Sequence, residues 1–290
     1  MTQRFDTISF LSDFGTSDEF VGVVKSVIAD IAPHARVIDL VHEIAPFDVR
    51  AGSLALARCI PYVPQGVVLA IVDPGVGSSR RGVAISVAGG TGIFVGPDNG
   101  LLASAIALAG GAEEAVVLSN SEYQLAAPGN TFAGRDIFAP AAAYLCNGVP
   151  LSELGDEIDP ALLLPGVVPL PIQKEDSLLG EVTWVDRFGN CQLNISLDDI
   201  AGWGEQIRVV ITNQATSERV VRSLRVVDNY SQVGGGIALV VDSYGLLAIC
   251  ADRGSAALEL HLGSSDLVAL SPDSPTQSIV TTNVHIGRKG

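Results

Sequence analysis

The chain has 290 residues, of which 48% are hydrophobic and 17% charged, and its net charge of −15 comes from 17 basic and 32 acidic residues. This composition is typical of a folded protein with a sizeable core and excludes a mainly disordered chain. It also argues against nucleic acid and anionic membranes as partners, because binding either needs clustered Lys and Arg.

Strand and helix patterns alternate along the first half of the chain. In order they are the strand 8–12, the helix 19–31, the strand 35–41, the helix 48–60, the strands 66–73, 82–87 and 92–95, the helix 99–109, the strand 115–118 and the helix 137–146. The strand 66–73 is continuously apolar up to Asp73, which is typical of a strand buried on both faces. The alternation predicts an α/β N-terminal domain over residues 1–160 with a mostly parallel sheet.

The second half has a different rhythm. The segment P-A-L-L-L-P-G-V-V-P-L-P-I has four prolines and no charge, which predicts an extended connector over 161–173. Strand-like runs follow at 179–185, 207–211, 219–224, 237–241, 246–251 and 257–262. They predict a smaller all-β, barrel-like domain over 174–265. The polar stretch S-P-D-S-P-T-Q-S predicts a mobile C-terminal tail over 266–290.

The four cysteines are isolated and show no C-x-x-C spacing. This pattern disfavours structural zinc and a disulfide framework, and it favours reduced core thiols in a cytoplasmic protein. The N-terminus has no signal-peptide pattern, and no apolar run is long enough to predict a membrane span.

Carboxylates follow three predicted strands of the first domain: Asp13 in D-F-G, Asp73 in D-P-G and Asp98 in G-P-D-N-G. Ligands of an open parallel sheet bind beyond the carboxyl ends of its strands, near a switch in strand order. Asp before Gly also forms simple turns and helix caps, so for these three residues a structural role remains an equal alternative.

Two of these carboxylates suit specific tasks. Asp13 is placed to accept hydrogen bonds from a ribose diol. Asp73 precedes Arg80 by seven residues, and an aspartate beside an arginine stays ionised, which suits charge stabilisation or the orientation of a water. A solvated turn is the alternative for the pair Arg80–Arg81.

The second domain contains D-R-F-G-N at 186–190. Phe188 between two hydrogen-bonding side chains, Asp186 and Asn190, suits a purine, although an Asx-type hairpin turn is the alternative. Similar turns occur at 229–231 and 242–245. In the first domain, Arg135 and Asp136 lie in an apolar stretch, where we expect a structural pair beside a gap that Gly134 leaves for ligand.

Seven segments together resemble the S-adenosyl-L-methionine hydroxide adenosyltransferases (SAM hydrolases), relatives of the fluorinating and chlorinating adenosyltransferases. The segments span most of the chain in family order: L-S-D-F-G-T-S-D (11–18), H-E-I-A-P-F-D-V (42–49), V-D-P-G-V-G-S-S-R-R (72–81), G-P-D-N-G-L-L (96–102), T-F-A-G-R-D-I-F-A-P-A-A-A (131–143), D-R-F-G-N (186–190) and D-S-Y-G (242–245).

The resemblance implies a homotrimer of two-domain subunits with its sites at subunit interfaces. It implies attack of a water-derived hydroxide on the 5′-carbon of S-adenosyl-L-methionine, which releases adenosine and L-methionine. No metal and no cofactor are expected, because the sulfonium leaves as a neutral thioether. Halide chemistry is not expected, since the halogenating relatives differ where this chain has V-D-P-G-V-G.

The resemblance also assigns the site residues. Asp73 and Arg80 would belong to a water-activating Asp-Arg-His set. The substrate-binding residues would be Asp13 on the ribose hydroxyls, Phe47 near the sugar and sulfonium, Phe188 and Asn190 on adenine, Tyr230 as a stacking partner, and Asp186 with Ser243 on the methionine end.

The chain departs from the family at Ala133, because hydrolytic members have T-F-H-G-R-D where this chain has T-F-A-G-R-D. A methyl group cannot relay a proton, so a weakened or inactivated enzyme is expected. Either a natural variant or a substitution that traps ligand would explain the alanine, and the intact surroundings favour the second.

Two other functions remain open. A non-catalytic sensor of adenosyl compounds would keep the ribose and adenine contacts without needing an Asp73–Arg80 pair. A Mg²⁺-dependent phosphohydrolase would use Asp13, Asp73 and Asp98 as metal ligands.

Overall fold

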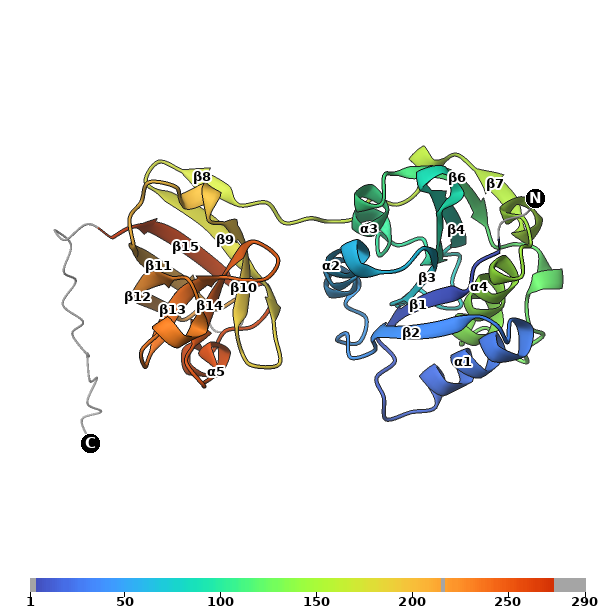
Figure 1. Ribbon diagram of the computed structural model, residues 1–290, viewed down its shortest axis with the longest axis horizontal. Helices are drawn as coiled ribbons and strands as arrows, with labels where there is room; N and C mark the ends of the chain where they lie inside the picture. The colour runs from blue at the N-terminus through green and yellow to red at the C-terminus, as the bar shows by residue number, and fades with distance from the viewer. Residues whose placement is uncertain (1–3, 215–216, 274–290) are drawn as a thin grey trace, which may run out of the picture. The chain divides into compact units, whose positions relative to one another are not determined.

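The computed structural model describes residues 4–214 and 217–273 (Figure 1). The chain divides into two compact units, Met1–Val168 and Pro169–Gly290. The division falls inside the segment 161–173 for which a connector is predicted. Each unit buries hydrophobic clusters of its own, so each folds around a separate core.

The first unit is built on one sheet. Its elements are β1 (Thr7–Ser12), α1 (Phe20–Ile31), β2 (Arg36–Val41), α2 (Val49–Cys59), β3 (Gly66–Ile71), β4 (Gly82–Val87), β5 (Gly92–Pro97), α3 (Ala103–Leu108), β6 (Ala112–Val117), α4 (Ala139–Cys146) and β7 (Asp156–Ile158). Within the described residues the seven strands have the order β2-β1-β3-β5-β4-β6-β7. Only β4 and β7 run against the others, so the predicted, mostly parallel sheet is confirmed.

Helices cover both faces of this sheet (Figure 1). Val67, Leu69 and Ile71 of β3 belong to a cluster with α1 and α4, whereas Val68 and Ala70 belong to a cluster with α2 and α3. Side chains alternate between the faces of a strand. A central strand that is covered on both sides must therefore be apolar throughout, which explains the unbroken apolar run in the sequence.

The strand order places a switch point between β1 and β3. The chain leaves β1 for β2 on one side and then returns to β3 on the other side of β1. Asp13 and Asp73 follow the ends of these two strands, so both lie at the carboxyl edge of the switch. β4 runs antiparallel to β5 and pairs Gly82 with Pro97, which puts the preceding Arg80 and Arg81 at the same edge.

The second unit is a closed barrel. Its elements are β8 (Ile172–Lys174), β9 (Ser177–Val185), β10 (Cys191–Ser196), β11 (Gln206–Thr212), β12 (Arg219–Val227), β13 (Ile237–Val241), β14 (Leu246–Ala251), α5 (Ala256–Leu260) and β15 (Leu267–Pro272). Among the described residues, β9 pairs with both β15 and β10 and so closes a ring of seven strands, while β8 adds to β9 from outside. The predicted barrel-like domain is confirmed.

Three sequence predictions need correction. The run 257–262 is not a strand but lies mostly in α5, because Ser255 caps the helix by accepting a hydrogen bond from the Leu258 N–H. The predicted tail 266–290 includes β15, a strand of the barrel, and its residues 274–290 lie outside the described part. The helix predicted at 137–146 begins earlier, in the π-helical turn η4 (Gly134–Phe138).

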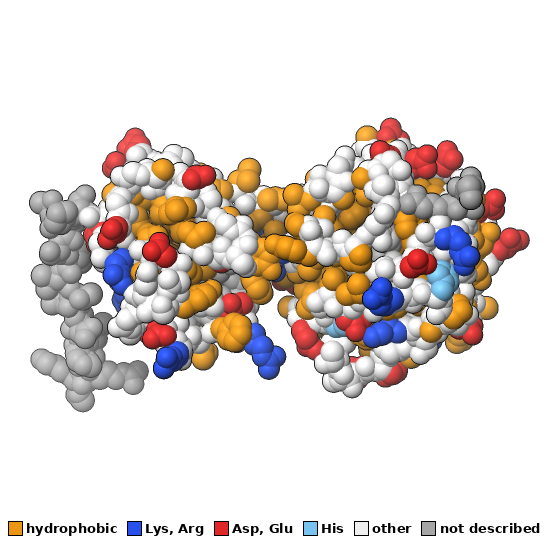
Figure 2. Space-filling view, viewed as in Figure 1, with side chains coloured by type: hydrophobic (Ala, Val, Ile, Leu, Met, Phe, Trp, Pro, Cys, Tyr) orange, Lys and Arg blue, Asp and Glu red, His pale blue; other side chains and the backbone are white. Residues whose placement is uncertain are grey.

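Acidic side chains are spread over the visible face of each unit, whereas basic side chains form small groups (Figure 2). This distribution agrees with the net charge of −15. None of the helices within residues 4–214 and 217–273 has the length and apolar character needed to cross a membrane.

Candidate functional site

Asp13 is fixed at the end of β1 by two contacts. Its backbone N–H donates to the carbonyl oxygen of Ile71 (3.2 Å), which ties it to the end of β3. Its Oδ2 accepts a hydrogen bond from the backbone N–H of Phe47 (2.9 Å). Phe47 has a φ of 69°, which is strained for a residue with a side chain. Its ring is 71% exposed, so the structure brings these two predicted substrate residues together with the ring facing solvent.

Asp73 and Arg80 form a buried ion pair. The distance from Arg80 Nη2 to Asp73 Oδ2 is 2.5 Å, and the side chains are 12% and 6% exposed. The Arg80 guanidinium also lies over the ring of Phe138, 5.3 Å from its centre. The two partners come from different strand ends, so the fold rather than a local turn creates the pair.

Arg81 binds a different carboxylate. Its Nε and Nη2 both donate to Asp98 Oδ2, and the other oxygen of Asp98 accepts from the Leu164 N–H (2.8 Å). The alternative of a solvated Arg80–Arg81 turn is therefore wrong. Both oxygens of Asp98 are occupied inside the first unit, which removes the structural support for Asp98 as a Mg²⁺ ligand. In the described ranges, no three His, Cys, Asp or Glu side chains form a group that could hold a metal ion.

Burial raises the pKa of Asp73 above its ordinary value, and the nearby Asp13 carboxylate adds to the rise, which together outweigh the opposing effects of Arg80 and of the Gly75 backbone N–H. Oδ1 of Asp73 is buried, and among the described residues it accepts no hydrogen bond. A buried carboxylate oxygen without a partner is costly in a purely structural pair. Asp73 thus has one oxygen fixed by arginine and one left for a ligand or a water.

Ala133 is nearly buried, with 7% exposure, and directly precedes η4. Phe138, at the other end of η4, packs beneath Arg80. The backbone of Gly77, in the loop between Asp73 and Arg80, also lies close to Asn130, three residues before Ala133. A Cβ added to Gly77 would be only 3.2 Å from the Asn130 carbonyl oxygen. The structure therefore brings the segment that carries Ala133 against the loop that carries the Asp73–Arg80 pair.

The neighbours of Ala133 have structural roles. Arg135 donates from Nε and Nη2 to the two oxygens of Asp136 (2.6 and 3.0 Å), so the expected structural pair is present. The gap predicted at Gly134 is not open to ligand, because a Cβ there would lie 3.0 Å from Phe14 and 3.2 Å from Phe132. Gly134 instead allows these two rings to pack against the backbone.

In the second unit, Asp186 organises its own turn. Its Oδ1 accepts from the backbone N–H groups of Phe188 (2.9 Å) and Asn190 (2.8 Å), and its Oδ2 accepts from Asn190 Nδ2 (2.8 Å). The Asx-type turn therefore exists, and it leaves the ring of Phe188 76% exposed. Because Nδ2 of Asn190 is engaged, Oδ1 of Asn190 is its acceptor for a ligand donor such as an exocyclic amine.

Tyr230 and Ser243 lie near this turn. Burial raises the pKa of Tyr230, and the nearby Cys250, Asp186 and Asp242 add to the rise. Asp242 holds the turn of Ser243 by accepting from the Tyr244 N–H (2.8 Å) and binds Gln192 of β10. The D-S-Y-G pattern predicts only a turn, and Asp242 as its organiser appears only in the structure.

Replacing Gly189 with alanine is expected to destabilise the second unit. Gly189 has a φ of +83°, and a Cβ there would lie 1.9 Å from Ser255 Oγ, which caps α5. Gly235 is the matched control, since its φ is +82° and a Cβ there would have no neighbour within 4 Å. The control should lose about 1 kcal/mol of unfolding free energy from backbone strain alone, and Gly189→Ala about 2 kcal/mol more from the overlap, in urea titrations. Equal losses would exclude the steric explanation.

Comparison with known proteins gives a consistent result. Residues 8–155 match the family of the SAM hydroxide adenosyltransferase N-terminal domain, and residues 180–269 match that of its C-terminal domain. An (R)-S-adenosyl-L-methionine hydrolase of Salinispora arenicola is 40% identical over 265 residues, covering 91% of this chain and 94% of that protein. One of Salinispora tropica is 42% identical over 266 residues, with the same coverage.

A solved structure has the same fold. It is that of an uncharacterized conserved protein from Thermotoga maritima, which is 34% identical, has a TM-score of 0.80, and is matched over 91% of this chain and 99% of its own. The likeness extends over both units of the chain, since the matched share exceeds either unit alone.

Proposed function

Since the chain belongs to the SAM hydroxide adenosyltransferase family, we propose that it hydrolyses S-adenosyl-L-methionine to adenosine and L-methionine. One water is consumed, one proton is released, and the C5′–S bond is replaced by a C5′–O bond. The observation that carries the proposal is the Asp73–Arg80 pair, in which one buried carboxylate oxygen has no hydrogen-bond partner among the described residues and lies near Asp13 at the β1–β3 switch.

The arrangement suits attack by water. Arg80 fixes Asp73, so that the free Oδ1 points to a defined position where it can accept a hydrogen bond from a water and take up its proton. A raised pKa makes this carboxylate a stronger base than an exposed aspartate. The sulfonium loses its positive charge as it leaves, and the carboxylates of Asp13 and Asp73 complement the charge that it carries beforehand.

The remaining residues bind the substrate. Asp13 receives the two ribose hydroxyls, with Phe47 against the sugar and sulfonium. Phe188 stacks on adenine and Tyr230 adds a second ring, while Asn190 accepts from the adenine amino group. Asp186 and Ser243 take the methionine end; three of the four lone-pair positions of Asp186 are used within its turn, which leaves one for the ammonium group.

The two sets of residues belong to different units of the chain, and we propose that they meet at the subunit interfaces of a cytoplasmic homotrimer. The reaction as written needs no metal or cofactor. Ala133 supplies neither a donor nor an acceptor to the attacking water, so this chain turns over slowly while it retains the contacts that bind substrate.

The test is incubation with S-adenosyl-L-methionine in oxygen-18 water, followed by chromatography and mass spectrometry. Adenosine carrying the label at its 5′-oxygen, together with unlabelled L-methionine, is the expected product pair at a rate above that of the buffer control. Methylthioadenosine alone would place the attack at another carbon and contradict the proposal. Binding without any turnover, including in the histidine variant considered in the Discussion, would favour a sensor.

A further inference from the structure

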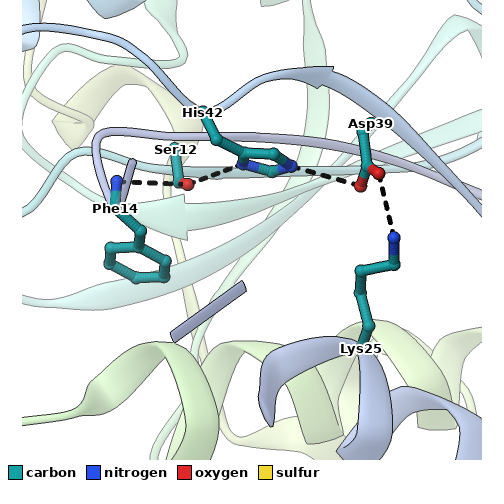
Figure 3. A network of polar contacts seen from close by, with 5 residues as sticks. All are labelled: Ser12, Phe14, Lys25, Asp39 and His42. Carbon is teal, nitrogen blue, oxygen red and sulfur yellow. Dashed lines mark hydrogen bonds and ion pairs between the residues drawn. The ribbon is translucent and has the colours of Figure 1, made fainter. Parts of the chain in front are cut away.

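A chain of polar contacts joins Lys25 through Asp39, His42 and Ser12 to the backbone of Phe14 (Figure 3). Lys25 Nζ donates to Asp39 Oδ2 (2.9 Å), Asp39 Oδ1 binds His42 Nε2 (3.1 Å), and His42 Nδ1 binds Ser12 Oγ (2.8 Å). Ser12 Oγ in turn accepts from the Phe14 N–H (3.4 Å). His42 and Ser12 are buried, and Ser12 directly precedes Asp13.

Which atoms donate and which accept in this network follows from the groups at its two ends, the Asp39 carboxylate and the Phe14 backbone N–H. Burial opposes the charge on Asp39, but the hydrogen bonds from Lys25 and His42 outweigh it and lower the pKa of Asp39. An ionised carboxylate only accepts, so His42 Nε2 carries a proton. In the neutral ring Nδ1 then accepts from the Ser12 hydroxyl, which leaves the lone pairs of Oγ for the Phe14 N–H.

Serine, histidine and aspartate also form the triads of hydrolases, but this set cannot act as one. Ser12 is 0% exposed, and its oxygen already accepts from the backbone of the turn. A nucleophile must reach the reacting carbon. The network therefore serves the position of the turn rather than covalent chemistry.

The segment that begins with His42 makes two further hydrogen bonds to the turn of residues 12–15. The carbonyl oxygen of His42 accepts from the Gly15 N–H (2.7 Å). The Phe47 N–H, five residues further on, donates to Asp13 Oδ2 (2.9 Å). Asp13 is therefore fixed by three contacts: His42 binds the preceding Ser12, the His42 carbonyl oxygen binds Gly15, and the Phe47 N–H binds one oxygen of the Asp13 carboxylate.

We propose that His42 is a positioning residue that, through Ser12 and its own carbonyl oxygen, sets the Asp13 carboxylate for two hydrogen bonds to the ribose diol. The inference rests on the proposed function, which assigns the diol to Asp13. A carboxylate accepts both hydroxyls only when its plane is fixed relative to the sugar. The hydrogen bonds to Ser12, Gly15 and Asp13 itself fix that plane.

The test compares the dissociation constants of adenosine and 2′,3′-dideoxyadenosine for the full-length chain, by calorimetry. The preference for adenosine measures the diol contacts alone, because both ligands share the base. His42→Ala should lower this preference about tenfold, the size of effect expected when a pair of charge-assisted hydrogen bonds is misplaced. His34→Asn is the matched control, since His34 is bonded elsewhere in the first unit, to the Cys146 carbonyl oxygen, and should leave the preference unchanged.

Two conservative variants separate the arms of the network. An asparagine amide can occupy the place of Nδ1, so His42→Asn should keep the Ser12 contact and most of the preference. A glutamine amide can occupy the place of Nε2, so His42→Gln should keep only the Asp39 contact and lose the preference. If His42→Ala does not fold, Ser12→Ala cuts the same link and should show the same loss.

The outcomes distinguish the positioning role of His42 from the assignment of the ribose diol to Asp13. If Asp13→Asn lowers the preference and neither His42→Ala nor Ser12→Ala does, the positioning role is wrong and the diol assignment stands. If Asp13→Asn also leaves the preference unchanged, the diol assignment itself is wrong. A loss of affinity that is equal for both ligands would mean that His42 supports the fold in general and would overturn the inference.

Discussion

Replacing Ala133 with histidine is expected to raise the rate of adenosine release from S-adenosyl-L-methionine on the order of 10²-fold, the usual contribution of one positioned acid–base group. Ala133 is 7% exposed and directly precedes the π-helical turn whose Phe138 supports Arg80. An imidazole there would extend from a segment that touches the Asp73–Arg80 loop, whereas a methyl group cannot exchange a proton. Initial rates measured by chromatography for both chains provide the check.

Ala133→Phe is the matched control for this prediction. It supplies a ring of similar size without a titratable nitrogen, so it should release adenosine no faster than the alanine chain. An equal gain from phenylalanine and histidine would show that position 133 acts through packing. Equal rates in the alanine and histidine chains would remove the catalytic role that we assign to the position.

The second large effect concerns Asp73. In the Ala133→His chain, a further Asp73→Asn substitution is expected to lower the rate of adenosine release by 10² to 10⁴-fold, the approximate range for a lost general base. The amide keeps the shape of the carboxylate and an acceptor oxygen but cannot take up the proton of the water. The measurement is the initial rate at saturating substrate, where a loss of binding does not contribute.

The pH dependence gives an independent signature. Burial, with a smaller contribution from Asp13, raises the pKa of Asp73 above the ordinary 3.8. The ionised form is the active base, so the rate should rise with pH through a limb that lies above pH 3.8 and should lose that limb in Asp73→Asn. Asp98→Asn is the control, because Asp98 is the neighbouring carboxylate paired with an arginine at this sheet edge. Equal losses in both variants would instead mean that any disrupted carboxylate–arginine pair at this edge lowers the rate, and would remove the specific role of Asp73.

The sequence predicted the positions of the two carboxylates that follow strand ends. Asp13 and Asp73 were expected at the carboxyl edge of a parallel sheet, and the β2-β1-β3 order places them on either side of its switch point. This inference works because a strand-like run followed closely by Asp and Gly reveals both the strand and its end.

Pairings between distant residues could not be predicted in the same way. The spacing of Asp73 and Arg80 predicted that they lie close together, but nothing local shows that the adjacent Arg81 binds the carboxylate seventeen residues later. The antiparallel start of β4 decides this, and it depends on pairing with β5. The contacts of His42 could not be predicted, because its partners Ser12 and Asp39 lie on two neighbouring strands whose register only the fold reveals.

The helix α5 shows how short runs mislead. The residues A-L-E-L-H-L alternate as a strand would, and a five-residue helix has too few turns to show its own period. The hydrogen bond that the N-cap Ser255 accepts from Leu258 stabilises the helix over the strand. Gly189 must lack a side chain, because a Cβ there would overlap that serine.

The backbone conformation of Phe47 should make selection for stability and selection for substrate binding favour different residues at this position. An aromatic residue held at a φ of 69° carries a strain of about 1–3 kcal/mol in every unliganded molecule. Glycine at this position would remove the strain but also the ring that we propose packs against the sugar. Directed evolution for thermostability alone should therefore tend to discard the aromatic residue at 47, while evolution for substrate affinity should retain it, so libraries screened on heat resistance need a parallel screen on binding.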